Sequence, residues 1–337
     1  MIDALSIESD APLAESGGIP KVYSALGAFL HLEPIEPDDE ARLDRVNALV
    51  WDWFGQRLRW SEAPFARGVP PFRRIDLDYI SGYCRTLELP VGPEIDRDAA
   101  IDFHFGRDGY SLDCSGGAHA AHASPYSYGF WSTFSGDPPG VRFQACSMLS
   151  LTVPDTWPHE DFAARVTAIA RELRLRWATA GLTYATGTVN DYQAANRAIF
   201  AHARRHWGYD VPEYLHYTVR LLDEIRSINW LTFLGPALAE RLRKEGKELV
   251  SADLLEISSA GDALRIRAGA RPEAGDVNRL QIPAAYQAAD ALVRPVRSSG
   301  GMFFSGGWTR DQTSDWLQRF GKGGAPLPPI DPDEIPF

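Results

Sequence analysis

The chain has 337 residues, of which 45% are hydrophobic and 23% are charged, and its formal net charge is −11. This composition is typical of a folded globular protein and excludes a disordered one, and no run reaches the roughly 18 apolar residues of a membrane-spanning helix. The negative charge disfavours direct binding to nucleic acid or to an anionic membrane, and it favours a basic protein partner.

The chain begins with a polar, acidic stretch. Residues 1–20 lack a basic start followed by an apolar block, so they predict a flexible leader and no secretion signal. The three cysteines, Cys84, Cys114 and Cys146, are few and widely spaced, which argues against a disulfide framework. Both observations predict a cytoplasmic protein, and in that compartment acidity can also serve solubility alone.

A strand followed by a helix is predicted over residues 27–60. Ala28, Leu30 and Leu32 recur at the period of a strand. The acids that follow, from Asp38 to Glu40, suit the positive end of a helix. Apolar residues then recur at helical spacing, namely Leu43, Val46, Val50, Trp53 and Phe54.

Residues 143–177 have a similar pattern. A strand-like run reaches Val153, and a helix follows whose apolar stripe is predicted to run from Phe162 to Trp177. Alignment of the two pieces pairs Pro34 with Pro154. A duplicated strand–helix unit would explain this pseudo-repeat, and so would chance similarity between two amphipathic helices.

The stretch "CSGGAHAAHASPYSYG" contains Cys114, His119 and His122. The Cys-x4-His-x2-His spacing offers three zinc ligands, but no fourth ligand follows at a recognisable distance. The abundance of Gly, Ala and Ser favours a loop between strands instead. We therefore predict no metal site here.

Three aromatic residues, Tyr126, Tyr128 and Phe130, follow on one face of a predicted strand. Large aromatic side chains serve both in cores and as interface anchors. Core packing is the favoured interpretation of this cluster, and a binding surface is the alternative.

A further helix is predicted over residues 191–207. His202 and His206 share one face of it, as the ligands of a metal site would. Two arginines lie between them and would oppose the binding of a cation. A basic patch near the helix C-terminus is therefore favoured over a metal site.

Strands and helices mix along the chain without the regular rhythm of a parallel sheet. Leu264, Ile266 and Ala268 alternate with arginines, as in a half-buried strand, and a helix face follows up to Val293. This predicts an α+β fold with a mostly antiparallel sheet packed by helices. We expect a single domain over residues 21–320 and an extended, Pro-rich acidic tail over residues 321–337.

Known catalytic and cofactor-binding motifs are missing from the sequence. It contains no P-loop, no dinucleotide fingerprint, no His-Glu-x-x-His and no G-x-S-x-G elbow. We predict no catalytic residue and no cofactor. The alternative is an enzyme whose site is assembled from distant residues, such as Asp102, His104 and Cys114.

Several stretches resemble a known bacterial family. "INWLTFLGPALAERL", "ARPEAGDVN", "IPAAYQAADALVRPV" and "FFSGGWTRDQTSDWLQRF" are similar, in order, to its sequence blocks, and "GAFLHLEP" fits as well. The family was long filed as a domain of unknown function. Its members are described as type VI secretion immunity proteins, TsiV-like, that neutralise nucleases with a VRR-type fold. The resemblance covers roughly residues 20–320, and its blocks contain no catalytic motif.

The resemblance implies a role for the apolar run at residues 226–242. In a protein without chemistry of its own, Trp230, Leu231, Phe233 and Leu234 would form a buried structural segment. Asn229 would bond neighbouring backbone, because a buried amide must be paired. Trp308 and Trp316 are expected to pack in the same core.

The resemblance also implies a partner, a cognate toxin whose DNA-binding face must be basic. The protein would bind that face and exclude the substrate. Exposed acids and aromatic anchors are the candidate contacts, namely Glu33, Glu36, Asp38, Asp39, Asp96, Asp98, Asp102, Tyr126 and Tyr128. Each acid can also be an ordinary helix cap or part of a solvated loop. An adaptor of the secretion apparatus is the remaining alternative.

Overall fold

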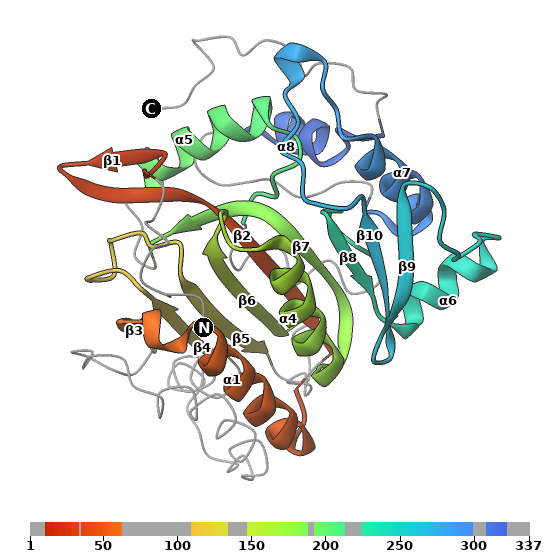
Figure 1. Ribbon diagram of the computed structural model, residues 1–337, viewed down its shortest axis with the longest axis horizontal. Coiled ribbons are helices and arrows are strands. Elements are labelled where there is room, and N and C mark those ends of the chain that lie inside the picture. The colour runs from red at the N-terminus through yellow and green to blue at the C-terminus, as the bar shows by residue number, and fades with distance from the viewer. Residues whose placement is uncertain are drawn as a thin grey trace, which may run out of the picture.

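The computed structural model describes residues 11–33, 35–62, 109–133, 147–187, 192–212, 224–298 and 308–321. These residues form one ten-stranded sheet and six α-helices (Figure 1). Every ladder between the strands is antiparallel, so the predicted α+β class is confirmed. No helix in this part of the chain combines the length and the apolar character that a membrane span requires.

The strand β2 (Ile19–Leu32) lies at the centre of the sheet. It pairs with β6 (Ser147–Pro154) on one side and with β7 (Leu175–Thr186) on the other, and β1 (Ala14–Ser16) pairs with its first residues. From β6 the sheet continues through β5 (Ser127–Thr133) and β4 (Gly109–Ser115) to β3 (Trp60–Glu62). From β7 it continues through β8 (Leu231–Leu234) and β10 (Ala263–Ala268) to the edge strand β9 (Leu255–Ala260).

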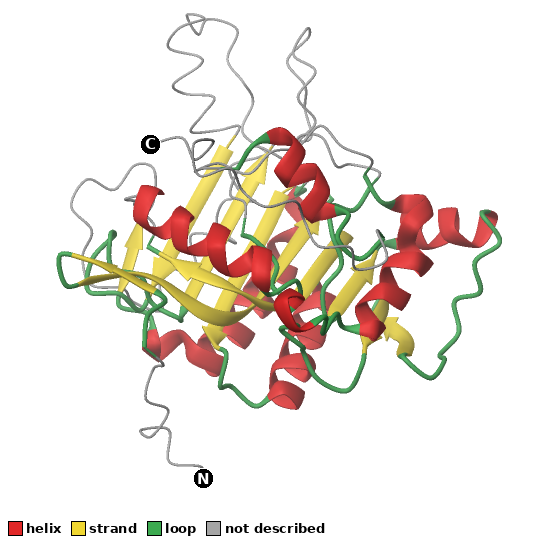
Figure 2. Ribbon diagram, turned by 90° about the horizontal axis from the view of Figure 1, so that it is seen from above, coloured by secondary structure: helices red, strands yellow, loops and turns green. Residues whose placement is uncertain are grey.

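Helices cover the sheet on both sides (Figure 2). They are α1 (Glu40–Phe54), α4 (His159–Glu172), α5 (Tyr192–Arg205), α6 (Pro236–Lys244), α7 (Ala284–Val293) and α8 (Arg310–Leu317). Helices α1 and α4 lie side by side (Figure 1), and α5 contacts β1 and β2. Helices α6 and α7 contact the strands at the β9 end of the sheet.

The apolar stripe predicted for α1 is confirmed, because its five residues are all buried. The stripe predicted for the second piece is right only in its first part. Phe162 and Val166 are buried on α4, but the helix ends at Glu172. Trp177 belongs to β7 and stacks on His31 at 3.8 Å between ring centroids. The prediction failed because a spacing of four residues fits one helix face and also one face of a strand.

Both pieces of the predicted pseudo-repeat contain a strand that leads into a helix, and β2 pairs with β6 while α1 contacts α4. A common origin of the two pieces stays a prediction. Residues 1–20, predicted as a leader, include β1 and the first two residues of β2. The division into leader, single domain and tail stays a prediction, since residues 1–10 and 322–337 lie outside the described residues.

The apolar part of the stretch at residues 226–242 is buried, as the family resemblance implied. Trp230, Leu231, Phe233 and Leu234 have no exposed surface, and Trp308 and Trp316 are also buried in the core. The amide of Asn229 donates to the carbonyl of Leu182 at 3.2 Å, and its oxygen accepts from the Trp230 N–H at 2.7 Å. Gly181 makes room for this amide, because a Cβ there would lie 2.3 Å from the Asn229 oxygen. The segment thus supports the sheet.

Candidate partner-binding surfaces

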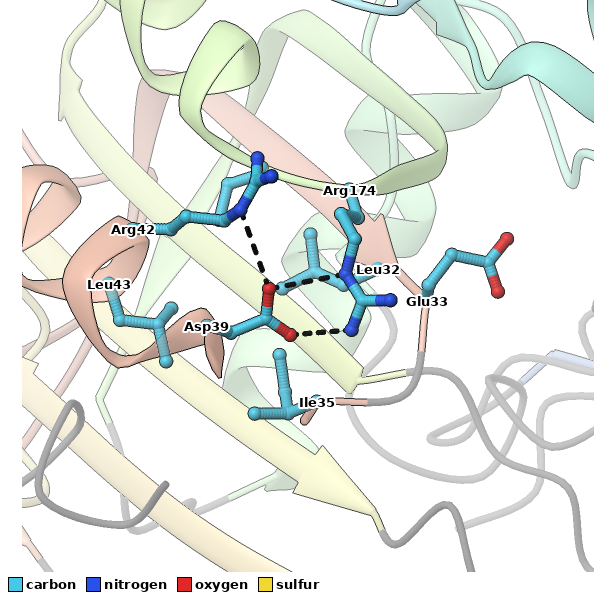
Figure 3. Close-up of a pocket in the computed structure, with 8 residues that line it drawn as sticks. Leu32, Glu33, Ile35, Asp39, Arg42, Leu43 and Arg174 are labelled. Carbon is cyan, nitrogen blue, oxygen red and sulfur yellow. Dashed lines mark hydrogen bonds and ion pairs between the residues drawn. The ribbon is translucent and has the colours of Figure 1, made fainter. Parts of the chain in front are cut away.

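Asp39, one of the predicted acids just before α1, lies against Arg174, which follows α4, and against Arg42 (Figure 3). One carboxylate oxygen of Asp39 accepts from Arg174 Nη2 at 2.6 Å, and the other accepts from Arg174 Nε at 3.1 Å. Arg42 Nε lies 3.7 Å from the same carboxylate. The bidentate bond to Asp39 raises the pKa of Arg174. Asp39 is 4% exposed, so it is a buried ion-pair partner of Arg174 and offers no surface to another protein.

Two of the other predicted acids are also paired with arginines. Glu33 lies 2.9 Å from Arg176, and Glu36 lies 3.4 Å from Arg174. Asp38 is exposed and has no ion-pair partner among the described residues. The charge at the start of α1 is therefore largely offset, with Asp38 as the exception.

A small hollow lies beside this ion-pair cluster (Figure 3). It is lined by Leu32, Glu33, Ile35, Asp39, Arg42, Leu43, Leu173 and Arg174. Its free volume is about 10 Å³, which is about what one water molecule needs. The hollow is therefore too small to hold a substrate.

The predicted aromatic contacts differ in their exposure. Tyr128 has no exposed surface, and its hydroxyl donates to Asn47 at 3.1 Å. Tyr128 is therefore a core residue, which corrects its prediction as a partner contact. Tyr126 precedes β5 and is half-buried, with the Arg57 guanidinium 5.9 Å from its ring centroid. Burial raises the pKa of Tyr126, and its role as a contact stays a prediction.

The remaining predicted acids, Asp96, Asp98 and Asp102, lie outside the described residues, as does His104. Both the partner-contact prediction for these acids and the alternative of a distant His/Asp/Cys site stay untested. Cys114, the third member of that alternative site, is buried in β4.

The glycine-rich stretch forms the predicted loop, which connects β4 to β5 over residues 116–126. The rings of His119 and His122 lie 5.7 Å apart. Nδ1 of His122 accepts from the Ala118 N–H at 3.3 Å, and desolvation lowers the pKa of His122. Among the described residues, no group of three or more His, Cys, Asp or Glu side chains is arranged to hold a metal ion.

The two histidines of α5 lie close together but form hydrogen bonds in different directions. Their ring centroids are 4.4 Å apart. Nδ1 of His202 lies 2.9 Å from the Tyr184 hydroxyl, and Nδ1 of His206 lies 2.7 Å from the Gly275 carbonyl. Burial, with help from the neighbouring charges, lowers the pKa of His202 to about 4. His202 is therefore neutral at neutral pH, which corrects its prediction as part of a basic patch.

Exposed apolar side chains are a feature that the sequence analysis did not single out. In the described part of the chain the large ones are Leu13, Val250, Leu254 and Leu280. Val250 and Leu254 both belong to the connection between α6 and β9. In the sequence, both residues lie in the short, polar connection "GKELVSADL". Aliphatic residues in such a connection could have drawn attention to it.

Comparison with known proteins shows which class this fold belongs to. A family model described as type VI immunity for VRR-NUC matches residues 96–320, well over half of the chain. The chain is thus a type VI immunity protein. Within that class it belongs to the TsiV family, whose members are directed against VRR-NUC effectors. The family resemblance found in the sequence is confirmed, although the match leaves β2 and α1 outside.

A solved structure has a similar fold. The T6SS protein PA0821 of Pseudomonas aeruginosa superposes with a TM-score of 0.70 over 94% of this chain and 84% of that chain. The two sequences are 18% identical, so the likeness concerns the fold. A search of curated proteins gives no match.

Proposed function

We propose that this protein binds the VRR-NUC effector directly and covers its DNA-binding or catalytic face, so that DNA cannot enter. Membership of the TsiV family is the observation that carries this proposal. The immunity is then steric, and the protein performs no reaction of its own. It acts in the cytoplasm, where the effector would meet DNA, and it needs no cofactor.

Electrostatics supports the choice of the DNA-binding face. A nuclease must neutralise phosphates with lysines and arginines, so its DNA-binding face is basic. A chain of net charge −11 attracts such a face over a long range and speeds association with it. The attraction between the two proteins should therefore weaken as salt is added.

Part of the negative surface lies on α1. Asp44 and Asp52 on α1, and Asp38 just before it, are exposed and have no ion-pair partner among the described residues. Glu33 and Glu36 contribute less to the field because arginines offset their charges. The contact roles predicted for Asp96, Asp98, Asp102 and Tyr126 remain part of this proposal.

Co-expression tests the proposal. We expect the cognate VRR-NUC protein to be encoded beside this chain. It is expressed in bacteria with and without the immunity protein, and an active-site variant of the nuclease is the control for toxicity. We expect growth to be rescued, and the purified proteins to elute together in size-exclusion chromatography. Failure of both rescue and complex formation contradicts the proposal. An adaptor would instead bind a component of the secretion apparatus and leave the nuclease toxic.

A further inference from the structure

Residues 248–254 form the last part of the connection between α6 and β9 and lie beside the edge strand β9, and we call them the edge segment. Ala252 and Leu255 exchange two backbone hydrogen bonds of 2.8 and 3.0 Å, so the chain reverses at Asp253 and Leu254. The N–H of Gly269 donates to the Leu254 carbonyl at 3.0 Å. The hydroxyl of Ser251 bonds the backbone of Ile257 in β9. These bonds fix the segment before a partner arrives, which lowers the entropy lost on binding.

Two aliphatic side chains of the edge segment are directed to solvent. Val250 is 62% exposed and Leu254 is 46% exposed, whereas Leu249 packs against the core. One exposed leucine needs no explanation. Here two of the four large apolar side chains that are exposed in the described residues lie on one ordered segment. Aliphatic side chains in such a position are suited to the apolar centre of an interface.

The two acids of the edge segment, Glu248 and Asp253, give it a negative charge. Glu248 and Asp253 are exposed, have no ion-pair partner among the described residues, and have no lysine or arginine beside them within the segment. The preceding Lys247 donates to the Ala291 carbonyl at 3.4 Å. The segment therefore combines two exposed aliphatic side chains with two carboxylates that form no ion pair in the described residues.

The start of α1 is a weaker candidate. Arginines offset three of its four predicted acids, and no large apolar side chain of α1 is exposed in the described residues. The edge segment also lies within residues 96–320, the part that matches the family, and the start of α1 does not. A second copy of this acidic chain would be repelled from the segment, whereas a basic partner would be attracted.

We propose that the edge segment is the surface on which the basic face of the VRR-NUC effector docks. Val250 and Leu254 enter an apolar part of that face, while Glu248 and Asp253 approach its lysines and arginines. This assignment rests on the proposed function, because it names the surface through which the immunity protein covers the nuclease.

Affinity measurements on two double variants test the assignment. The probe is the nuclease domain of the effector, inactivated at its active site, and binding is followed by biolayer interferometry. For Val250→Ser with Leu254→Ser we expect Kd to rise ~100-fold, mostly through faster dissociation. For Glu248→Lys with Asp253→Lys we expect a rise of ~10-fold through slower association, and this effect should shrink in high salt.

Matched controls come from the rest of the surface. Leu280→Ser removes a leucine that is 77% exposed, and Asp44→Lys with Asp52→Lys reverses two unpaired acids on α1. We expect Leu280→Ser to change Kd by less than ~3-fold, because Leu280 lies outside the docking surface. We expect the α1 variant to raise Kd less than the edge acid variant does, because it weakens the long-range attraction alone. All substituted positions are exposed, so the variants should keep the wild-type Tm.

Hydrogen exchange of the wild-type complex gives a second measurement that needs no variant. We expect the amides of residues 248–254 to exchange more slowly in the complex than in the free protein. The docking assignment is wrong if both edge variants bind with wild-type affinity, or if the α1 variant loses more affinity than either of them. Either result leaves the proposed function standing. If the wild-type protein itself does not bind the nuclease domain, the proposed function fails first.

Discussion

The side chain of Ser251 bonds both backbone groups of Ile257. Its hydroxyl accepts from the Ile257 N–H at 2.8 Å and donates to the Ile257 carbonyl at 3.3 Å. Ile257 lies on β9, the edge strand of the sheet, where unpaired backbone groups invite another strand to add. Ser251 thus occupies backbone groups of β9 that another strand could pair with, and it also holds the edge segment in place.

Ser251→Ala should loosen the edge segment. The loss of two exposed hydrogen bonds costs about 1 kcal/mol of unfolding free energy, because water replaces them in part. The amides of residues 250–257 should exchange with deuterium faster than in the wild type, while those of β2 and β7 stay unchanged. Unchanged exchange in the edge segment would show that other contacts hold it.

Leu280→Gly should stabilise the protein. Leu280 is the one residue other than glycine with a positive φ in the described part of the chain, at 56°, and it is 77% exposed. A left-handed conformation costs an L-residue about 1–2 kcal/mol, and the flexibility of glycine in the unfolded chain cancels about half of the gain. We expect a net gain of about 0.5–1 kcal/mol in urea unfolding. Leu254→Gly, at an exposed site without positive φ, should destabilise and is the control.

Asp210→Ala should be strongly destabilising. Asp210 has no exposed surface and accepts from Arg226 at 2.8 Å and from Thr179 at 3.0 Å. Removal of the carboxylate leaves the buried guanidinium of Arg226 without this counter-ion, which costs about 3–5 kcal/mol. The measurement is the free energy of unfolding in urea. Asp44→Ala on the exposed face of α1 should change it by less than about 0.5 kcal/mol.

Stability should fall between pH 7 and pH 5. The folded pKa of His202 is about 4, below its ordinary value of about 6.5. The unfolded chain therefore binds more protons in this window, so stability is complete above pH 6.5 and is lost as the pH falls toward 4. Burial also lowers the pKa of His31, which acts in the same direction.

The variant His202→Gln isolates the contribution of this histidine. After allowance for screening at a half-buried site, we expect the loss between pH 7 and pH 5 to shrink by about 1 kcal/mol relative to the wild type. An undiminished loss in His202→Gln would place the pH dependence elsewhere.

Periodicity in the sequence was sufficient to predict the elements whose burial is local. The stripe of α1 could be recognised because burial repeats at the period of a helix. Burial of the run around Trp230 was instead implied by the family resemblance. The end of α4 was predicted wrongly because the spacing of Leu173 and Trp177 fits the period of a helix and also that of a strand. Periodicity therefore predicts which residues are buried better than where an element ends.

The candidate surface was much harder to predict from the sequence. Asp39 was interpreted from its neighbours as a charge at a helix start, but its partner Arg174 is 135 residues away in the sequence. For Tyr128 core packing was the favoured interpretation, and a binding surface stayed as the alternative because strand alternation does not say which face of the sheet is covered. The aliphatic residues in the polar connection "GKELVSADL" could have drawn attention to Val250 and Leu254. Their exposure, however, depends on how the edge segment folds back on β9.

A competition experiment tests the central claim most directly. A fluorescent DNA duplex is bound to the inactivated VRR-NUC nuclease domain, and its anisotropy is followed as the immunity protein is added. The account predicts that the DNA is released completely and that its apparent Kd rises in proportion to the concentration of free immunity protein. Formation of a ternary complex, in which the nuclease holds the DNA and the immunity protein together, would contradict it.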